Sequence, residues 1–434
     1  MKAEIKKWGI NGEGITYSKR KPVFIPYAIP GEIVDYSIVK EEERYNIGEV
    51  ERILEKSNLR KNMSCKKGMD CGGCSLMHVQ YKGQCKMKEQ ILRESLLKYA
   101  GYRGKIEPIV KNPNPLGYRN SCKLPFGMEY GQLVTGMYSA NSRKFVPIEK
   151  CIVHSKYLEW TRQSVLEILN KYHCEAFDPE TRKGYRFLVM KEFHQKVQVI
   201  LVTSDDEISE DIINELLNVE AITSLWQSKK MGDSIDVFGE EMIHLGKDKT
   251  ITVEINGLKL SLDPKSFFQL NTEQAANLYS LVKENVYKTG RIVEAYCGIG
   301  GISLMVSGLA KEVIGIEYVD EAVENASMNA RNNHIKNAHF ECGDAAEKLK
   351  GILEKKKINT LIVDPPRSGL DQNMREVIRN SNINTIIYVS CNPSTLAKDI
   401  KDIQNYRIRK VQPLDMFSQT SHIETIVLLQ KLNS

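Results

Sequence analysis

The stretch VEAYCGIGGISL, residues 293–304, decides the fold of the C-terminal part of this chain. An apolar run rich in β-branched residues stops at a glycine-rich turn, and a helix-like segment begins directly after it. Gly298, Gly300 and Gly301 allow the backbone to come close to a ligand, because glycine has no Cβ atom. This order of strand, turn and helix is typical of an open α/β sheet, whose ligands bind at the carboxyl ends of the strands.

Strand and helix signals alternate from residue 262 to the end of the chain. The seven strand candidates are RIVEAYCG, EVIGIEYV, AHFECGD, INTLIVDPP, NTIIYVSCN, YRIRKVQPLDMF and TIVLLQKL. Helical stretches separate them, which predicts an α/β fold with a doubly wound sheet over residues 262–434.

Two acidic residues follow the next two strand candidates and indicate which ligand the turn binds. Glu317 ends its strand 19 residues after Gly298, where a carboxylate can bind both hydroxyls of a ribose. Asp344 ends the third strand, where an acid can face an adenine. Ser303 stands where a dinucleotide motif would have its third glycine. We therefore interpret the turn as an S-adenosylmethionine site rather than a nicotinamide site; a glycine-rich turn with unrelated surface acids is the alternative.

The fourth and fifth strand candidates end on reactive side chains. Asp364 closes the fourth strand in LIVDPPRSGL, residues 361–370, and two prolines stiffen the turn after it. Cys391 closes the fifth strand in NTIIYVSCNPSTLAKDI, residues 384–400, and Asn392-Pro393 follows. In a doubly wound sheet both ends open into one crevice. A thiol there is either a small hydrophobic residue or a nucleophile.

A nucleophilic thiol at this place suits the methylation of a pyrimidine. Carbon C5 of uracil is too weak a nucleophile to attack a sulfonium methyl group unaided, but a thiolate that adds to C6 turns C5 into an enolate carbon. A base must then remove the C5 proton, and the nucleotide must be turned out of its stack. Glu424, in SQTSHIETIVLL, opens the last strand and is the candidate base; an ordinary solvated carboxylate is the alternative.

The rest of the chain predicts further domains. At 434 residues the chain is too long for one ordinary core. Residues 1–55 contain several short strands and turns, typical of an OB-type β-barrel that can bind nucleic acid. Residues 81–101 predict a helix with Ile91, Leu92, Leu96 and Leu97 on one side. The following α+β region has strands at RFLVMKEF and KVQVILVTS and helices near residues 155–172 and 207–218.

Bulk composition indicates a globular intracellular protein. Hydrophobic residues make up 41% of the chain, and the net charge is +6, which suits a polyanionic partner. No apolar run approaches the ~20 residues of a membrane helix, and the N-terminus lacks a signal peptide, so we expect a cytoplasmic protein. The ten cysteines are then thiols or metal ligands rather than disulfides.

Three of these cysteines lie in one loop, CKKGMDCGGC, as Cys65, Cys71 and Cys74. They need a further ligand to complete a metal site, and Cys85 and Cys151 are the candidates. Zinc fits the C-x2-C spacing, whereas the paired glycines leave room for a bulkier inorganic core. Reduced structural thiols are the remaining alternative.

Five motifs in this chain, in this order, resemble those of the RNA uracil-C5 methyltransferases over nearly the whole length. They are DPKSFFQLN, CGIGG, IVDPPRSGL, VSCNPSTLAKD and SHIETIVLL. The resemblance implies a TRAM-like barrel at 1–55, a middle domain at 56–261 and a Rossmann-like class I methyltransferase domain at 262–434, on which helix 81–101 is expected to pack. It implies Cys391 as nucleophile and Glu424 as base. The residues that it implies for the S-adenosylmethionine and uracil site are Gln269, Tyr296, Glu317, Asp344 and Asp364.

The cysteine loop resembles that of the iron–sulfur branch of this family. The likeness implies a [4Fe-4S] cluster held by Cys65, Cys71, Cys74 and Cys151. It also implies that a monomer forms 5-methyluridine in 23S rRNA, with tRNA as the second candidate substrate.

Arg367 indicates which pyrimidine would be methylated. RNA cytosine-C5 enzymes carry a cysteine directly after a proline in the strand-four motif, where this chain has Arg367, and this favours uracil. A non-catalytic RNA-binding iron–sulfur protein and a small-molecule methyltransferase remain as alternatives.

Overall fold

The computed structural model describes residues 1–140, 142, 144–232 and 234–432, which form two compact units. Unit 1 combines Met1–Pro115 with Asp364–Ser434, and unit 2 is Leu116–Val363. Segments from the beginning and from the end of the sequence therefore share one unit. The division into domains at residues 55 and 261 stays a prediction. No helix in the described part of the chain is long and apolar enough to cross a membrane.

Unit 1 begins with six strands of two to ten residues in one sheet, ordered β1-β5-β6-β4-β3-β2. They are β1 (Lys2–Glu4), β2 (Lys7–Trp8), β3 (Gly14–Ser18), β4 (Lys21–Ile25), β5 (Ile33–Glu41) and β6 (Asn46–Glu55). Alternate apolar side chains turn inward and form a small core that contains Ile5, Val23, Ile25, Val34 and Tyr36. The predicted run of short strands is present, and its assignment to the TRAM type remains a prediction.

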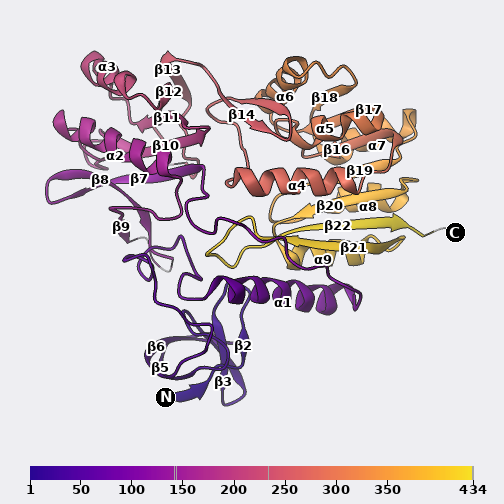
Figure 1. Cartoon of the computed structure of the whole chain (residues 1–434), viewed down its shortest axis with the longest axis horizontal. Coiled ribbons are helices and arrows are strands. Elements are labelled where there is room, and N and C mark those ends of the chain that lie inside the picture. The colour runs from indigo at the N-terminus through magenta and orange to yellow at the C-terminus, as the bar shows by residue number, and fades with distance from the viewer. Residues whose placement is uncertain (141, 143, 233, 433–434) are drawn as a thin grey trace. The chain divides into compact units, whose positions relative to one another are not determined.

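Helix α1 (Tyr81–Ala100) packs against α9 (Pro393–Asp402) within unit 1, as Figure 1 shows. It ends at Gly101, whose φ of 66° is left-handed and suits a residue without a Cβ. The predicted apolar side is buried except for Leu97, which is 42% exposed. Gln84 and Lys88 are buried instead, so part of the inner face of this helix is polar.

The C-terminal strands of unit 1 form an antiparallel group ordered β20-β22-β21. These strands are β20 (Thr385–Ser390), β21 (Tyr406–Leu414) and β22 (Glu424–Lys431), and α8 (Gln372–Asn380) precedes them. Their residues are mostly buried on both faces, which explains the near-continuous apolar runs in the sequence.

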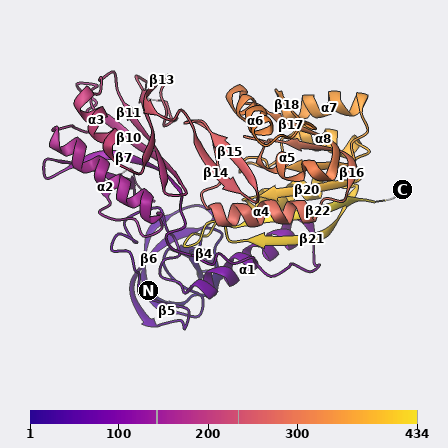
Figure 2. The same cartoon turned by 45° about the horizontal axis from the view of Figure 1, so that its top comes forward.

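Unit 2 begins with a sheet ordered β13-β12-β11-β10-β7-β8-β9, against which α2 and α3 pack (Figure 2). The strands are β7 (Ser121–Glu129), β8 (Gln132–Tyr138), β9 (Phe145–Pro147), β10 (Tyr185–Phe193), β11 (Lys196–Thr203), β12 (Ile222–Lys229) and β13 (Glu241–Lys247). The helices are α2 (Lys156–Lys171) and α3 (Glu210–Asn218). The two strands and two helices predicted here are confirmed as β10, β11, α2 and α3.

The second part of unit 2 holds four parallel strands ordered β18-β17-β16-β19. The elements are β16 (Thr289–Ala295), β17 (Ala310–Glu317), β18 (Ala338–Cys342), β19 (Thr360–Val363), α5 (Gly301–Val306), α6 (Asp320–Asn332) and α7 (Ala345–Lys355). The hairpin β14 (Ile251–Ile255) and β15 (Leu258–Leu262) and helix α4 (Thr272–Glu284) precede them. All seven strand candidates of residues 262–434 are therefore strands.

Candidate active site

Cys391 and Glu424 lie at the ends of neighbouring antiparallel strands in unit 1. The last residue of β20, Ser390, pairs with Thr425 of β22. Continued by one residue, this register sets Cys391 opposite Glu424. Residues opposite each other in an antiparallel ladder lie close together and on the same face. The structure therefore brings the candidate nucleophile and the candidate base together.

The turn after Cys391 is held by its own capping residue. The side chain of Asn392 accepts a hydrogen bond from the backbone N–H of Ser394 (3.1 Å) and so caps the N-terminus of α9. Pro393 occupies the first helical turn, where its missing N–H costs nothing. The Asn392 amide also donates to the carbonyl of Arg367 (3.1 Å), which ties this turn to the segment after Asp364.

Two carboxyl groups at this site retain protons more readily than usual. Glu424 is 3% exposed, and its Oε1 atom has no hydrogen-bond partner among the described residues. Burial raises the pKa of Glu424 well above its ordinary value, and the charge of Asp364 raises it further. Burial also raises the pKa of Asp364. Carboxyl groups with such shifts are suited to proton transfer near neutral pH.

The Cys391 thiol is protonated at neutral pH in the free protein. Burial and the nearby charge of Glu424 raise the pKa of Cys391 to about 11, whereas the Arg367 guanidinium acts in the opposite direction. The Arg367 charge likewise opposes the increase in the pKa of Glu424. In the sequence, Arg367 indicates only a preference for uracil over cytosine. A cation in the turn after the fourth strand is also a signal for a residue that stabilises a nearby thiolate.

Removal of the Arg367 charge is expected to make Cys391 less reactive. In Arg367→Met the thiol pKa rises further, so iodoacetamide alkylates Cys391 more slowly at every pH from 7 to 10. In the wild type the rate rises about tenfold per pH unit over this range, because only the thiolate reacts. Mass spectrometry of the alkylated peptide measures the rate. Arg367→Lys keeps the charge and serves as the control; equal rates for wild type and Arg367→Met would contradict the assignment.

The glycine turn of unit 2 adopts a backbone that suits a close ligand. Gly298 and Gly300 have φ values of 51° and 81°, and Tyr296 has 66°. The left-handed conformation is costly for a tyrosine, and such strain often occurs at binding sites. Glu317, at the end of β17, accepts a hydrogen bond from the Gly298 N–H through Oε2 (3.0 Å). Tyr296, the turn and Glu317 are thus brought together.

The other predicted cofactor residues have structural contacts of their own. Asp344 caps the N-terminus of α7, and its Oδ1 accepts hydrogen bonds from Ala346 and Glu347 at 3.0 Å each. This role competes with the predicted contact to adenine. The backbone carbonyl of Gln269 accepts from the Asn120 amide (3.0 Å) just before α4 begins.

Two cysteines of the loop lie near one tyrosine, but the described residues of the loop form no complete metal site. Burial raises the pKa of Tyr27, and the charges of Cys71 and Cys74 raise it further. Both cysteines therefore lie near the Tyr27 hydroxyl. The Cys71 sulfur accepts a hydrogen bond from the Gly73 N–H (3.4 Å). Among the described residues, however, no three His, Cys, Asp or Glu side chains form a group that could hold a metal ion. Cys65 lies in the same loop, six residues before Cys71.

The two candidates for a fourth ligand lie in different surroundings. Cys151, in unit 2, is largely buried, yet its hydrogen bond to His154 lowers its pKa. Burial and the charge of Asp415 raise the pKa of Cys85, on α1. A thiolate ligand is therefore easier to form at Cys151 than at Cys85.

Comparison with known proteins places these features in a family. Residues 80–432 match the family model described as tRNA (uracil-5-)-methyltransferase. An uncharacterized RNA methyltransferase of Listeria monocytogenes serovar 1/2a is 37% identical over 98% of this chain and 96% of its own. One of Clostridium tetani is 35% identical over 97% and 94%.

A solved structure matches the fold across the whole chain. The Pyrococcus abyssi tRNA (uracil-54, C5)-methyltransferase, in complex with S-adenosyl-L-homocysteine, has a TM-score of 0.81 and 26% identity, with 99% of each chain covered. The mixed α/β fold with its several sheets is therefore one that an S-adenosylmethionine-dependent methyltransferase adopts.

Proposed function

Because the chain belongs to the tRNA (uracil-5-)-methyltransferase family and is an RNA methyltransferase, we propose that it methylates C5 of uracil in RNA with S-adenosylmethionine as the donor. The observation that supports this most is the register that sets Cys391 opposite Glu424. A nucleophile and a proton acceptor side by side are what the two halves of this reaction need.

The first half of the proposed reaction activates the ring. Cys391 releases its proton to solvent, its thiolate adds to C6, and the C5–C6 π electrons become those of an enolate. Carbon C5 then takes the methyl group, and S-adenosylhomocysteine leaves with the electron pair of the broken S–CH3 bond. Arg367 supports this half, because its charge favours the thiolate.

The second half restores the aromatic ring. Glu424, as carboxylate, takes the C5 proton; the electrons of that C–H bond form the C5–C6 double bond, and the Cys391 thiolate leaves. Glu424 then passes the proton to solvent before the next cycle. Because burial raises the pKa of Glu424, its ionised fraction, and with it the rate of this half, rises with pH.

The donor would bind at the glycine turn of unit 2. Glu317 would bind the ribose hydroxyls beside the backbone N–H groups of Gly298, Tyr318 and Val319, from which its carboxylate accepts hydrogen bonds. We assign Tyr296, Gln269 and Asp344 to the same site, and Asp364 to the uracil side of it. When bound, S-adenosylmethionine would supply a methyl group that its positively charged sulfonium activates for transfer.

Tritium release from RNA labelled at uridine C5 tests the function. Each methylation frees one C5 proton, so release must require S-adenosylmethionine. We propose 23S rRNA as the substrate and expect release from rRNA of a strain that lacks the gene. Transfer RNA is the second candidate, favoured by the match to a tRNA (uracil-54) enzyme. Absence of release from both RNAs would contradict the proposed function.

We also propose that Cys65, Cys71, Cys74 and Cys151 hold a [4Fe-4S] cluster, with no part in the reaction steps above. The sulfur donors and the Gly73 N–H bond to Cys71 support this. Protein purified without oxygen is expected to contain about four iron and four sulfide ions per chain. Cys71→Ser should lose them, whereas Cys342→Ser should not. Zinc without sulfide, or no metal, would contradict the proposal.

A further inference from the structure

The segment that precedes Glu424 is held from outside the methyltransferase strands. Residues Asp415–Ser421 connect β21 to β22, and Glu424 begins β22 three residues later. Most side chains of this segment are buried, although it is a loop. A buried loop must satisfy its polar groups with partners other than water. In unit 1 these partners come from residues 75–115, and above all from α1.

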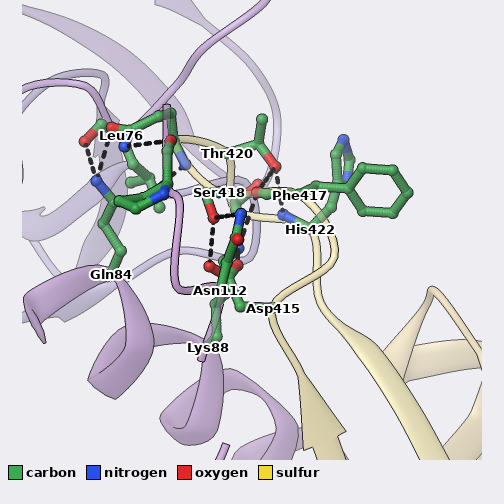
Figure 3. Close-up of polar contacts among 12 residues, drawn as sticks. Leu76, Gln84, Lys88, Asn112, Asp415, Phe417, Ser418, Thr420 and His422 are labelled. Carbon is green, nitrogen blue, oxygen red and sulfur yellow. Dashed lines mark hydrogen bonds and ion pairs between the residues drawn. The ribbon is translucent and has the colours of Figure 1, made fainter. Parts of the chain in front are cut away.

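Lys88 makes the central contact. Its side chain is 0% exposed, and it forms an ion pair with Asp415, whose side chain is 1% exposed (Figure 3). The Lys88 ammonium also donates to the carbonyl of Phe417 (2.9 Å). A buried charge that loses its partner is strongly destabilising, so this pair fixes where the segment can lie.

Asp415 also accepts hydrogen bonds from two hydroxyl groups. Its Oδ2 accepts from the Tyr81 hydroxyl (2.7 Å) at the start of α1 and from Ser418 (2.6 Å) in the segment itself. The Asn112 amide donates to Ser418 (2.9 Å). Figure 3 shows Lys88 and Ser418 bound to Asp415, and Asn112 bound to Ser418. Both oxygen atoms of the Asp415 carboxylate therefore have partners, which hold the group in this orientation.

Gln84 forms the second contact, one helical turn before Lys88. Its amide donates to Gln419 Oε1 and its Oε1 accepts from the Gln419 N–H, both at 2.9 Å. The Leu76 N–H donates to the Gln419 carbonyl (2.9 Å), and Ser75 accepts from the Ser421 N–H (3.2 Å). These bonds fix the segment up to two residues before Ile423 and three before Glu424.

We infer that Lys88 and Gln84 of α1 are positioning residues for Glu424, and that they set the carboxylate in place through the segment Asp415–Ser421. This inference rests on the proposed function, because it assigns Glu424 the removal of the C5 proton. A displacement of about 1 Å at a reacting group can reduce a rate about 100-fold. The second half-reaction therefore depends on the Lys88 and Gln84 side chains, whereas the turn of Cys391 is held by Asn392 and has no hydrogen bond to these two side chains among the described residues.

Separate measurement of the two halves tests this. Lys88→Met is expected to slow tritium release from uridine RNA about 30-fold to 100-fold in single turnovers. Formation of the covalent complex with 5-fluorouridine RNA, which needs no C5 proton abstraction, should slow less than about threefold. Covalent protein–RNA complex should also accumulate on ordinary RNA. Lys86→Met, an exposed lysine on α1, is the control.

A milder variant covers the case in which Lys88→Met does not fold. Tyr81→Phe removes the hydroxyl that donates to Asp415 and accepts from the Asn112 N–H, and about fivefold slower tritium release with unchanged covalent complex formation is expected. The inference would be overturned if, with an active wild type, a folded variant slowed tritium release and covalent complex formation equally. It would also be overturned if the variant slowed neither of them. A wild type that releases no tritium would overturn the proposed function as well.

Discussion

Cys391→Ala is expected to lose methylation of uridine by at least about four orders of magnitude, because uracil C5 has no other source of electron density at this site. Binding of S-adenosylmethionine should not change, since the candidate donor residues Glu317 and Tyr296 lie elsewhere in the sequence. Tritium release measures the first quantity, and equilibrium dialysis with labelled donor measures the second.

The matched control for this variant is Cys174→Ala. Cys174 follows α2 in unit 2, and its thiol contacts the hydroxyl of Tyr185 (3.6 Å) rather than any residue proposed for proton transfer or donor binding. Its activity should stay within about twofold of the wild type. Methylation by Cys391→Ala at a rate near that of the wild type would exclude the covalent route.

Glu424→Gln is expected to stop the reaction after methyl transfer. The amide cannot accept the C5 proton, so turnover should fall about 10²-fold to 10⁴-fold. Methylated RNA should then remain bonded to Cys391, and a protein–RNA complex that survives denaturing electrophoresis should accumulate on ordinary RNA. Gel shift with labelled RNA and labelled methyl donor measures both products.

Glu354→Gln, on the exposed side of α7, controls for the removal of a carboxylate. It should leave turnover unchanged and give no stable complex. Normal turnover by Glu424→Gln would show that another group takes the C5 proton. Loss of turnover without any covalent complex would show that Glu424 acts before, and not after, methyl transfer.

The features of this chain that could be predicted from sequence are local ones. The glycine turn at Gly298 and Gly300 needs a left-handed backbone, and both residues have it. The strand before Cys391 and the cap at Asn392 follow from an apolar run and an Asn-Pro pair within a few residues. Each signal lies within the element that it predicts, so no knowledge of the tertiary structure was needed.

The features that could not be predicted depend on distant partners. Lys88 and Asp415 are 327 residues apart, and periodicity alone gives no reason to bury a lysine in α1. The same helix exposes Leu97, although the periodicity places it on the apolar side with Ile91, Leu92 and Leu96. Asp344 shows a different difficulty, since a carboxylate after a strand can equally bind a ligand or cap the next helix.

The central claim is a transient bond between the sulfur of Cys391 and C6 of uracil, and its most direct test is mass spectrometry of protein incubated with S-adenosylmethionine and 5-fluorouridine RNA. Fluorine at C5 cannot leave as a proton, so the methylated intermediate stays attached. The account predicts a nucleotide carrying both fluorine and the new methyl group on the peptide that contains Cys391. Methylation of ordinary RNA with no such adduct, or an adduct on another residue, would contradict it.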